Sequence, residues 1–269
     1  MSTSKDYLKN FRISKKLGQV FLRDKNILRN IVEAGKLNKN DVVLEIGAGF
    51  GNLTEKLVEK VKKVFAVEKD RRLCQFLREK FKKRKGVKII EGDIRDCLET
   101  LSKNLKDYKI LGNIPYYLTS NLLERIFKLK NQPKLIVFMV QKEVAKRIVA
   151  SPPEMNRLAI LVQFFARAEI FHYVSKNCFF PKPKVDSAIL RIFPKKPLFE
   201  NEEVFFKVVK AGFSHPRKKI LKNLSKGLCL EKEVVKRVLK ICKIKEEERA
   251  ERLSLKDWIN LTNEFLKLK

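Results

Sequence analysis

The chain has 269 residues, of which 44% are hydrophobic, so it can bury a full core and does not have the composition of a disordered chain. It carries 61 Lys and Arg against 31 Asp and Glu, a net charge of +30. This excess indicates a polyanionic partner and favours RNA or DNA over an anionic membrane. No apolar run approaches the roughly 20 residues of a transmembrane span, and the first residues lack a secretory signal's apolar segment. We therefore expect a cytoplasmic protein.

The cysteines show no paired spacing, and the sequence has only two histidines, so we expect no metal site. Scattered cysteines suit a reducing cytoplasm. The cysteines are Cys74, Cys97, Cys178, Cys229 and Cys242.

Residues 1–16 interleave cations with Tyr7, Phe11 and Ile13. This pattern predicts an arm that docks on nucleic acid or over the active site, and the alternative is an unstructured tail.

An apolar run at 41–47 enters a glycine-rich turn and then a helical pattern, as in nucleotide-binding units. The spacing Gly47-x-Gly49-x-Gly51 differs from the dinucleotide fingerprint. With Glu45 it matches the Glu-x-Gly-x-Gly-x-Gly turn of S-adenosylmethionine-dependent methyltransferases. Glycines here let the backbone approach a ligand without Cβ clashes.

Acidic residues follow the next two predicted strands. Glu68 ends the strand at 63–67 and is placed to accept both ribose hydroxyls of a cofactor; the alternative is an anion at a helix N-terminus. Asp93 follows the strand at 87–90 and would accept from the cofactor's adenine amine, while Ile94 covers the ring. The alternative for Asp93 is a turn residue.

The stretch Asn113-Ile114-Pro115-Tyr116 follows a short apolar strand at 108–111. Pro115 has no N–H and Ile114 is held extended, so the backbone presents Asn113 and nearby carbonyls as a rigid edge. An exocyclic amine could donate to the Asn113 side-chain oxygen and the Ile114 carbonyl while its ring stacks on Tyr116. This resembles the Asn-Ile-Pro-Tyr motif of adenine N6 methyltransferases. The alternative is a strand-to-loop turn with an aromatic plug.

A second aromatic pair lies in the stretch 177–187, among prolines and lysines. We interpret Phe179 as a second stacking plate opposite Tyr116; the alternatives are Phe180 in that role, or a core role for both. Lys182 and Lys184 would meet backbone phosphates.

Strands alternating with helices predict an α/β, Rossmann-like parallel sheet covered on both faces. We expect a methyl-donor-binding catalytic domain at 1–195 and a small all-helical RNA-binding domain at 198–269, where Arg217, Lys218 and Lys219 favour phosphate contact. Further strands are predicted at 134–140, 168–174 and 187–193, and helices at 118–129, 141–150 and 156–168.

Together these motifs resemble the family of small-subunit ribosomal RNA adenine N6,N6-dimethyltransferases, the dimethyladenosine transferases of the kasugamycin-sensitivity type. The motifs run in order from Gly18-Gln19-x-Phe21-Leu22-x-Asp24 through Glu45–Thr54, Gly92-Asp93 and Asn113–Tyr116 to Phe179-x-Pro181-x-Pro183-Lys-Val-Asp-Ser187.

The resemblance implies transfer of methyl groups from S-adenosylmethionine to N6 of two adjacent adenines near the 3′ end of 16S rRNA. S-adenosylhomocysteine would be the product, with no metal, and the partner an immature small ribosomal subunit bound by a monomer. It implies catalytic roles for Asn113, Pro115, Tyr116 and Phe179. The implied cofactor contacts are Gln19, Val20, Leu22, Glu45, Gly47, Gly49, Glu68, Asp93, Ile94 and Asn113.

Val20 departs from the family, which usually has Asn at this position. A contact of the side chain with the cofactor would be lost here, and a contact of the backbone would be kept. The alternatives are a 23S rRNA adenine N6-methyltransferase of the macrolide-resistance type and a non-catalytic RNA-binding ribosome assembly factor.

Overall fold

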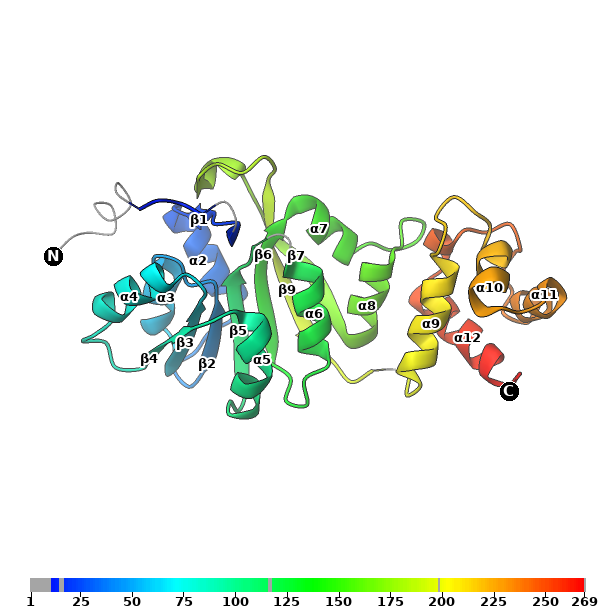
Figure 1. Ribbon diagram of the computed structural model, residues 1–269, viewed down its shortest axis with the longest axis horizontal. Coiled ribbons are helices and arrows are strands. Elements are labelled where there is room, and N and C mark those ends of the chain that lie inside the picture. The colour runs from blue at the N-terminus through cyan, green and yellow to red at the C-terminus, as the bar shows by residue number, and fades with distance from the viewer. Residues whose placement is uncertain (1–10, 15–16, 116–117, 198, 269) are drawn as a thin grey trace. The chain divides into compact units, whose positions relative to one another are not determined.

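The computed structural model describes residues 11–14, 17–115, 118–197 and 199–268. Two compact units divide the chain (Figure 1). The sheet unit comprises residues 1–145 and 168–194, and the helical unit comprises 146–167 and 195–269. Tyr116 and most of the predicted N-terminal arm lie outside the described residues.

In the described part of the chain, seven strands form one sheet in the order β4-β3-β2-β5-β6-β9-β7. The pairings from β4 to β6 are parallel, which confirms the predicted α/β class. The departure is β9, which runs antiparallel to β6. The strands are β2 (Val42–Ile46), β3 (Lys63–Glu68), β4 (Val87–Glu91), β5 (Tyr108–Asn113), β6 (Leu135–Gln141), β7 (Ala166–Val174) and β9 (Ser187–Pro194).

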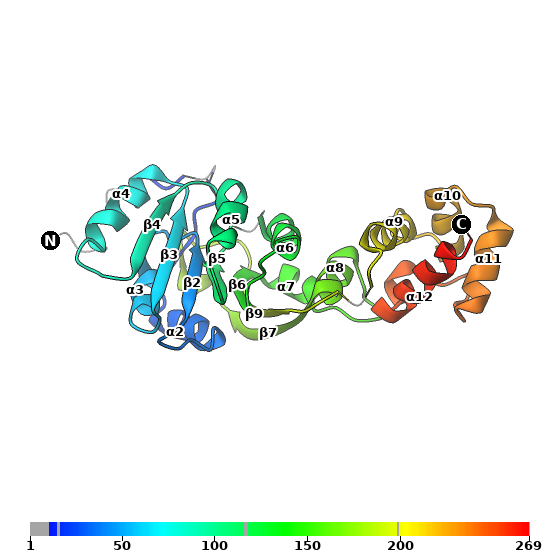
Figure 2. The same ribbon diagram turned by 90° about the horizontal axis from the view of Figure 1, so that it is seen from below.

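Helices cover both faces of this sheet, with α2 and α3 on one face and α5 and α6 on the other (Figure 2). In α2, apolar residues at helical spacing, Ile27, Leu28 and Ile31, are buried against the sheet. Strand β6 is buried along nearly its whole length, as a strand covered on both faces should be. The helices are α2 (Lys25–Ala34), α3 (Asn52–Val58), α4 (Arg71–Lys80), α5 (Ile94–Lys103), α6 (Thr119–Phe127) and α7 (Lys142–Ile148).

Gly112 lets β5 pair closely with β2. It pairs with Ile46, and a Cβ at this position would lie 2.5 Å from the main-chain oxygen of Ile46. Since that neighbour is backbone, it cannot move aside without disturbing the sheet. Gly112 thus fixes the strand end that carries Asn113.

A separate two-stranded sheet joins two motifs that are far apart in the sequence. Strand β1 (Phe21–Leu22) pairs antiparallel with β8 (Phe179–Phe180), so Leu22 lies opposite Phe179. The N-terminal motif and the Phe-x-Pro-x-Pro motif therefore form one structural feature.

The helical unit is built on aromatic packing. Phe164 stacks on Phe205 with ring centroids 4.6 Å apart, and Trp258 is fully buried beside Gly212. Its helices are α8 (Arg157–Phe165), α9 (Glu202–Gly212), α10 (Ile220–Leu228), α11 (Lys232–Ile241) and α12 (Leu255–Leu266). Among the described residues, no helix combines the length and apolarity needed to cross a membrane.

The unit boundaries differ from the predicted ones, because residues 146–167 group with the C-terminal helices and not with the sheet. The rings of Phe164 and Phe165 pack on those of Phe205 and Phe206, which explains the grouping. Helix α8 also ends earlier than predicted, since β7 begins directly after it.

Candidate active site

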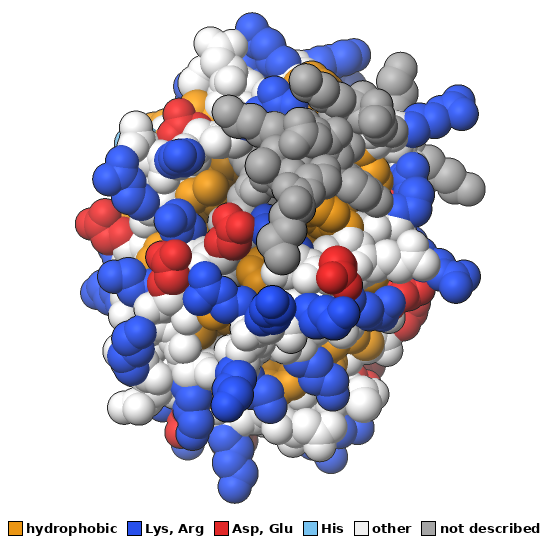
Figure 3. Space-filling model, turned by 90° about the vertical axis from the view of Figure 1, so that its left-hand side faces the viewer, with side chains coloured by type: hydrophobic (Ala, Val, Ile, Leu, Met, Phe, Trp, Pro, Cys, Tyr) orange, Lys and Arg blue, Asp and Glu red, His pale blue; other side chains and the backbone are white. Residues whose placement is uncertain are grey.

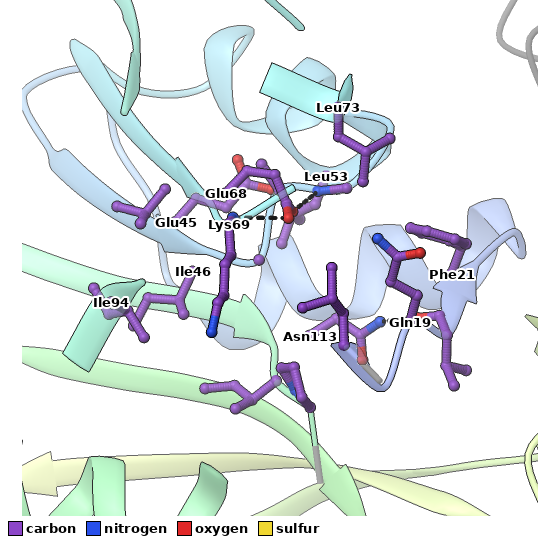
Figure 4. A pocket seen from close by; sticks show the side chains of 18 of the residues that line it. Gln19, Phe21, Glu45, Ile46, Leu53, Glu68, Lys69, Leu73, Ile94 and Asn113 are labelled. Atoms are coloured by element: carbon purple, nitrogen blue, oxygen red, sulfur yellow. Dashed lines mark hydrogen bonds between the residues drawn. The ribbon is translucent and has the colours of Figure 1, made fainter. Parts of the chain in front are cut away.

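A cavity lies at the carboxyl-terminal ends of the parallel strands, the edge at which open α/β sheets bind ligands (Figure 4). All the sequence-predicted cofactor residues line it, together with Pro115. They are Gln19, Val20, Leu22, Glu45, Gly47, Gly49, Glu68, Asp93, Ile94 and Asn113.

The glycine-rich turn between β2 and α3 brings bare backbone to this cavity. Gly47 and Gly49 have φ angles of +75° and +57°, where L side chains are strained. A Cβ on Gly49 would lie 3.1 Å from the ring of Phe21, and one on Gly47 would lie 3.3 Å from the main-chain oxygen of Asn113. The turn therefore suits close approach by a ligand, as the glycine spacing predicts.

Glu68, at the end of β3, has a carboxylate that accepts hydrogen bonds from main-chain N–H groups. Its Oε2 accepts from the N–H of Gly49 at 2.9 Å, and its Oε1 accepts from those of Lys69 and Asp70 at 2.8 and 2.9 Å. Burial raises the pKa of Glu68, although these hydrogen bonds oppose the shift. Three of about four acceptor positions are filled, which leaves one for a ligand hydroxyl.

Glu45 is buried beneath the turn. Its Oε2 accepts a 2.6 Å hydrogen bond from the hydroxyl of Thr54. Burial raises the pKa of Glu45 to about 8, with a smaller contribution from the nearby Glu68. The environment therefore favours a neutral carboxylic acid at this position near neutral pH.

Asp93 caps α5 and also forms two ion pairs. Its carboxylate accepts from the main-chain N–H of Arg95 at 2.9 Å, from the Arg95 guanidinium and from the Lys69 ammonium. The Arg95 guanidinium is the main cause of an Asp93 pKa well below its usual range. Asp93 therefore has the predicted turn role and also lines the cavity.

Asn113 ends β5 at the cavity wall, with its side chain held by the N-terminal motif. Its Nδ2 donates a 2.9 Å hydrogen bond to the main-chain carbonyl of Val20. In the described part of the chain no donor lies on the Asn113 side-chain oxygen. This orientation leaves that oxygen as an acceptor, as the methyl-transfer hypothesis requires.

The two aromatic residues of β8 have opposite environments. Phe179 is buried, with 5% of its surface exposed, and belongs to the core cluster that contains Leu22. Phe180 is 38% exposed, and the guanidinium of Arg23 lies 3.9 Å from its ring centroid. Phe179 does not line the cavity, so the structure does not bring this candidate together with the others.

Residues 10–267 match the family described as ribosomal RNA adenine dimethylase. This chain belongs to that family. A protein of Dehalococcoides mccartyi named ribosomal RNA small subunit methyltransferase A is 38% identical, with 98% of this chain and 93% of the relative covered. One of the same name from Clostridium botulinum is 36% identical, with 94% of each chain covered.

Two solved structures resemble this member of the dimethylase family over nearly its whole length. A dimethyladenosine transferase from Plasmodium falciparum has a TM-score of 0.76 and 28% identity, with 92% of this chain and 98% of the other covered. The 23S rRNA methyltransferase ErmE has a TM-score of 0.73 and 25% identity, with 91% and 98% covered.

Residue 20 of this dimethylase contacts Asn113 through its backbone. The contact that residue 20 makes with Asn113 uses its main-chain carbonyl, and the Val20 side chain packs against the core. This hydrogen bond therefore does not depend on the side chain at position 20.

Two further residues of the site were not predicted from sequence. Asp70 accepts a 2.8 Å hydrogen bond from the Gln19 side chain, which ties the N-terminal motif to the end of β3. Lys69 lines the cavity and pairs with Asp93. The available signal was their position directly after Glu68, at the ligand-binding edge of the sheet.

Proposed function

We propose that this chain transfers methyl groups from S-adenosylmethionine to N6 of two adjacent adenines near the 3′ end of 16S rRNA. The names of relatives at 36–38% identity, all small subunit methyltransferases, support this substrate. The observation that carries the chemistry is the hydrogen bond of Asn113, a cavity-lining residue whose amide nitrogen donates to the Val20 carbonyl and whose oxygen is left as an acceptor.

The residues around the cavity fit the methyl donor. The bare turn at Gly47 and Gly49 admits the amino-acid part, Glu68 accepts from the ribose, and Asp93 and Ile94 hold the adenine. Gln19, Val20 and Leu22 close the opposite wall. S-adenosylmethionine, when bound, supplies an activated methyl group on a sulfonium.

The target amine is held by two oxygens at the end of β5. It donates one hydrogen to the Asn113 side chain and one to the carbonyl of Ile114, which lies before the N–H-free Pro115. Both acceptors favour a tetrahedral, nucleophilic nitrogen, and they strengthen as its hydrogens become more positive. In this proposal Tyr116 stacks on the target ring, and β8 supplies a second stacking ring, either Phe179 or the more exposed Phe180.

No general base is required among the residues of the site. Methylation turns the amine into an aryl ammonium, which is acidic and loses its proton to water. The protein's contribution is positioning and the exclusion of water from the reacting atoms.

The partner in this proposal is the RNA of an immature small subunit, bound in the cytoplasm by a monomer, with the target base extruded into the cavity. Lys and Arg side chains crowd the face of the sheet unit seen in Figure 3. In the helical unit, Arg217, Lys218 and Lys219 are exposed and supply further phosphate contacts.

The structural likeness to ErmE makes 23S rRNA the second candidate substrate. Purified immature small subunits, large subunits and free rRNAs would each be incubated with labelled methyl donor, and modified nucleotides mapped by mass. We expect label in 16S rRNA as N6,N6-dimethyladenine at two adjacent positions. Label confined to 23S rRNA would replace this substrate, and absence of label would favour a non-catalytic assembly factor.

A further inference from the structure

The Asp93 carboxylate has no acceptor position to spare. Its Oδ1 accepts from the Arg95 main-chain N–H at 2.9 Å and from Arg95 Nε at 3.0 Å. Its Oδ2 accepts from Arg95 Nη2 at 2.7 Å and from Lys69 Nζ at 2.9 Å. A carboxylate offers about four lone-pair positions, and these donors fill them. An adenine amine can therefore bond to Asp93 only if a present donor withdraws.

Lys69 is the donor that can withdraw. Arg95, in the first turn of α5, donates hydrogen bonds to Asp93 from both its main-chain N–H and its guanidinium. Lys69 reaches Asp93 from the end of β3 through a single ammonium on a flexible stem, and its side chain is 49% exposed while that of Asp93 is 8% exposed. Releasing Lys69 from Asp93 breaks one ion pair and leaves the helix cap intact.

Lys69 stands in the cavity itself. It lines the same wall as Glu68, Asp93 and Ile94, and its side chain extends from beside Glu68 across the space between the labelled Ile94 and Asn113 in the view of Figure 4. Its main-chain N–H is fixed by Glu68 at 2.8 Å, so the stem begins at a defined point. The ammonium thus lies against Asp93 Oδ2, an atom to which the adenine amine could donate in the proposed function.

We propose that Lys69 determines base specificity in the donor pocket, because its ammonium competes with the adenine amine for Asp93 Oδ2. This inference rests on the proposed function, in which Asp93 receives the donor's adenine. A base with an oxygen in place of the amine would accept a hydrogen bond from the Lys69 ammonium. Lys69 could make this bond while it stays paired with Asp93. Lys69 therefore weakens binding of adenine and tolerates a 6-oxo purine.

The probes that isolate this effect are S-adenosylhomocysteine and S-inosylhomocysteine. Both are zwitterions of zero net charge in the amino-acid part, so the +30 charge of the chain does not bias the comparison. Calorimetry would give the Kd of each for the full-length protein and for Lys69→Met, which keeps an unbranched stem and removes the ammonium. The control is Lys128→Met, which breaks the pair of Lys128 with Glu124, also 2.9 Å long and outside the cavity.

We expect Lys69→Met to bind S-adenosylhomocysteine roughly two- to fivefold more tightly, the scale of a half-exposed ion pair. Lys69→Met should bind S-inosylhomocysteine more weakly, so its preference for the adenosyl over the inosyl ligand should rise. Lys128→Met should leave the Kd of each ligand unchanged. If Lys69 had only a structural role, its replacement would change the affinities for both ligands in the same direction.

An unchanged preference in a folded Lys69→Met protein that still methylates small subunits would overturn the inference and leave the proposed function standing. Failure of the unaltered protein to bind S-adenosylhomocysteine and to transfer methyl groups would overturn both.

Discussion

The side-chain nitrogen of Asn113 donates to the main-chain carbonyl of Val20 at 2.9 Å, and this one hydrogen bond joins the N-terminal motif to the end of β5. Because the nitrogen is engaged, the amide cannot flip, and its oxygen keeps the orientation of an acceptor. The bond uses the backbone of residue 20 and does not depend on the side chain at that position.

The first prediction concerns Asn113 and the transfer step. Asn113→Ala should lower the methyl-transfer rate by about 10²-fold or more, the effect of losing one preorganised electrostatic contact. RNA binding should barely change, because phosphate contacts elsewhere carry it. Single-turnover kinetics on small subunits would measure the first and second transfers separately.

Val20→Asn is the matched control for this prediction. It restores the family residue and keeps the main-chain carbonyl, so both transfer rates should stay close to those of the unaltered chain. A normal first transfer in Asn113→Ala would reduce Asn113 to a turn residue.

The second prediction concerns Glu68. Glu68→Ala should weaken donor binding by about 2–3 kcal/mol, the scale of charge-assisted hydrogen bonds. It should also lower the melting temperature, because the N–H groups of Gly49, Lys69 and Asp70 lose their acceptor. Calorimetry and thermal unfolding would be measured on the same sample. Unchanged donor affinity with reduced stability would leave Glu68 a purely structural role.

The third prediction separates the two aromatic residues of β8. If Phe179 is the second plate, Phe179→Leu should cost roughly 1–3 kcal/mol of stacking in RNA-dependent activity, while donor affinity is kept. Phe180→Leu is the matched control, because it changes the exposed ring and leaves the buried one. Thermal unfolding would correct for the core role of Phe179. If Phe180→Leu lost more activity than Phe179→Leu at equal stability, Phe180 would be the second stacking residue.

The sequence predicted the sheet and the cavity wall well because each signal was local. An apolar strand followed by Gly47-x-Gly49, Glu68 or Asp93 places that residue at the same edge of a parallel sheet, whatever the rest of the chain does. Asn113 reaches this edge for the same reason, because it ends β5.

Features set by contacts between distant segments could not be predicted. The pairing of β1 with β8 joins residues more than a hundred positions apart, and nothing in either dipeptide specifies the partner. The grouping of α8 with the C-terminal helices depends on Phe164 meeting Phe205. The saturation of Asp93 by Lys69 and Arg95 likewise appears only when side chains are placed.

The fourth prediction concerns the basic cluster of the helical unit. A protein that contacts about 6–10 phosphates should lose around 10³–10⁵ in RNA affinity between about 50 and 200 mM salt. Replacing Arg217, Lys218 and Lys219 with Ala should flatten that slope and leave donor affinity unchanged. The control replaces Lys82, Lys83 and Arg84, an equal charge on the exposed loop after α4. Equal effects of both sets would indicate general attraction without a defined contact.

The last prediction concerns the pH dependence that Glu45 gives to stability. Folding raises the pKa of Glu45 from 4.5 to about 8, mainly through burial. The folded state therefore binds this proton more tightly than the unfolded chain does. The stability that results is fully present below the unfolded pKa and is lost as pH rises through the folded one.

Glu45→Gln keeps a neutral side chain at every pH. The free energy of unfolding of the unaltered protein, relative to Glu45→Gln, should therefore fall as pH rises from about 5 to about 8, by up to about 1.4 kcal/mol per pH unit. Denaturant unfolding at a series of pH values would measure it. Thr54→Val removes the hydrogen bond that lowers this pKa. In this variant the fall in the free energy of unfolding should therefore extend to higher pH. Parallel curves for the unaltered protein and Glu45→Gln would mean that Glu45 is ionised in the folded state over this pH range, and would contradict a raised pKa.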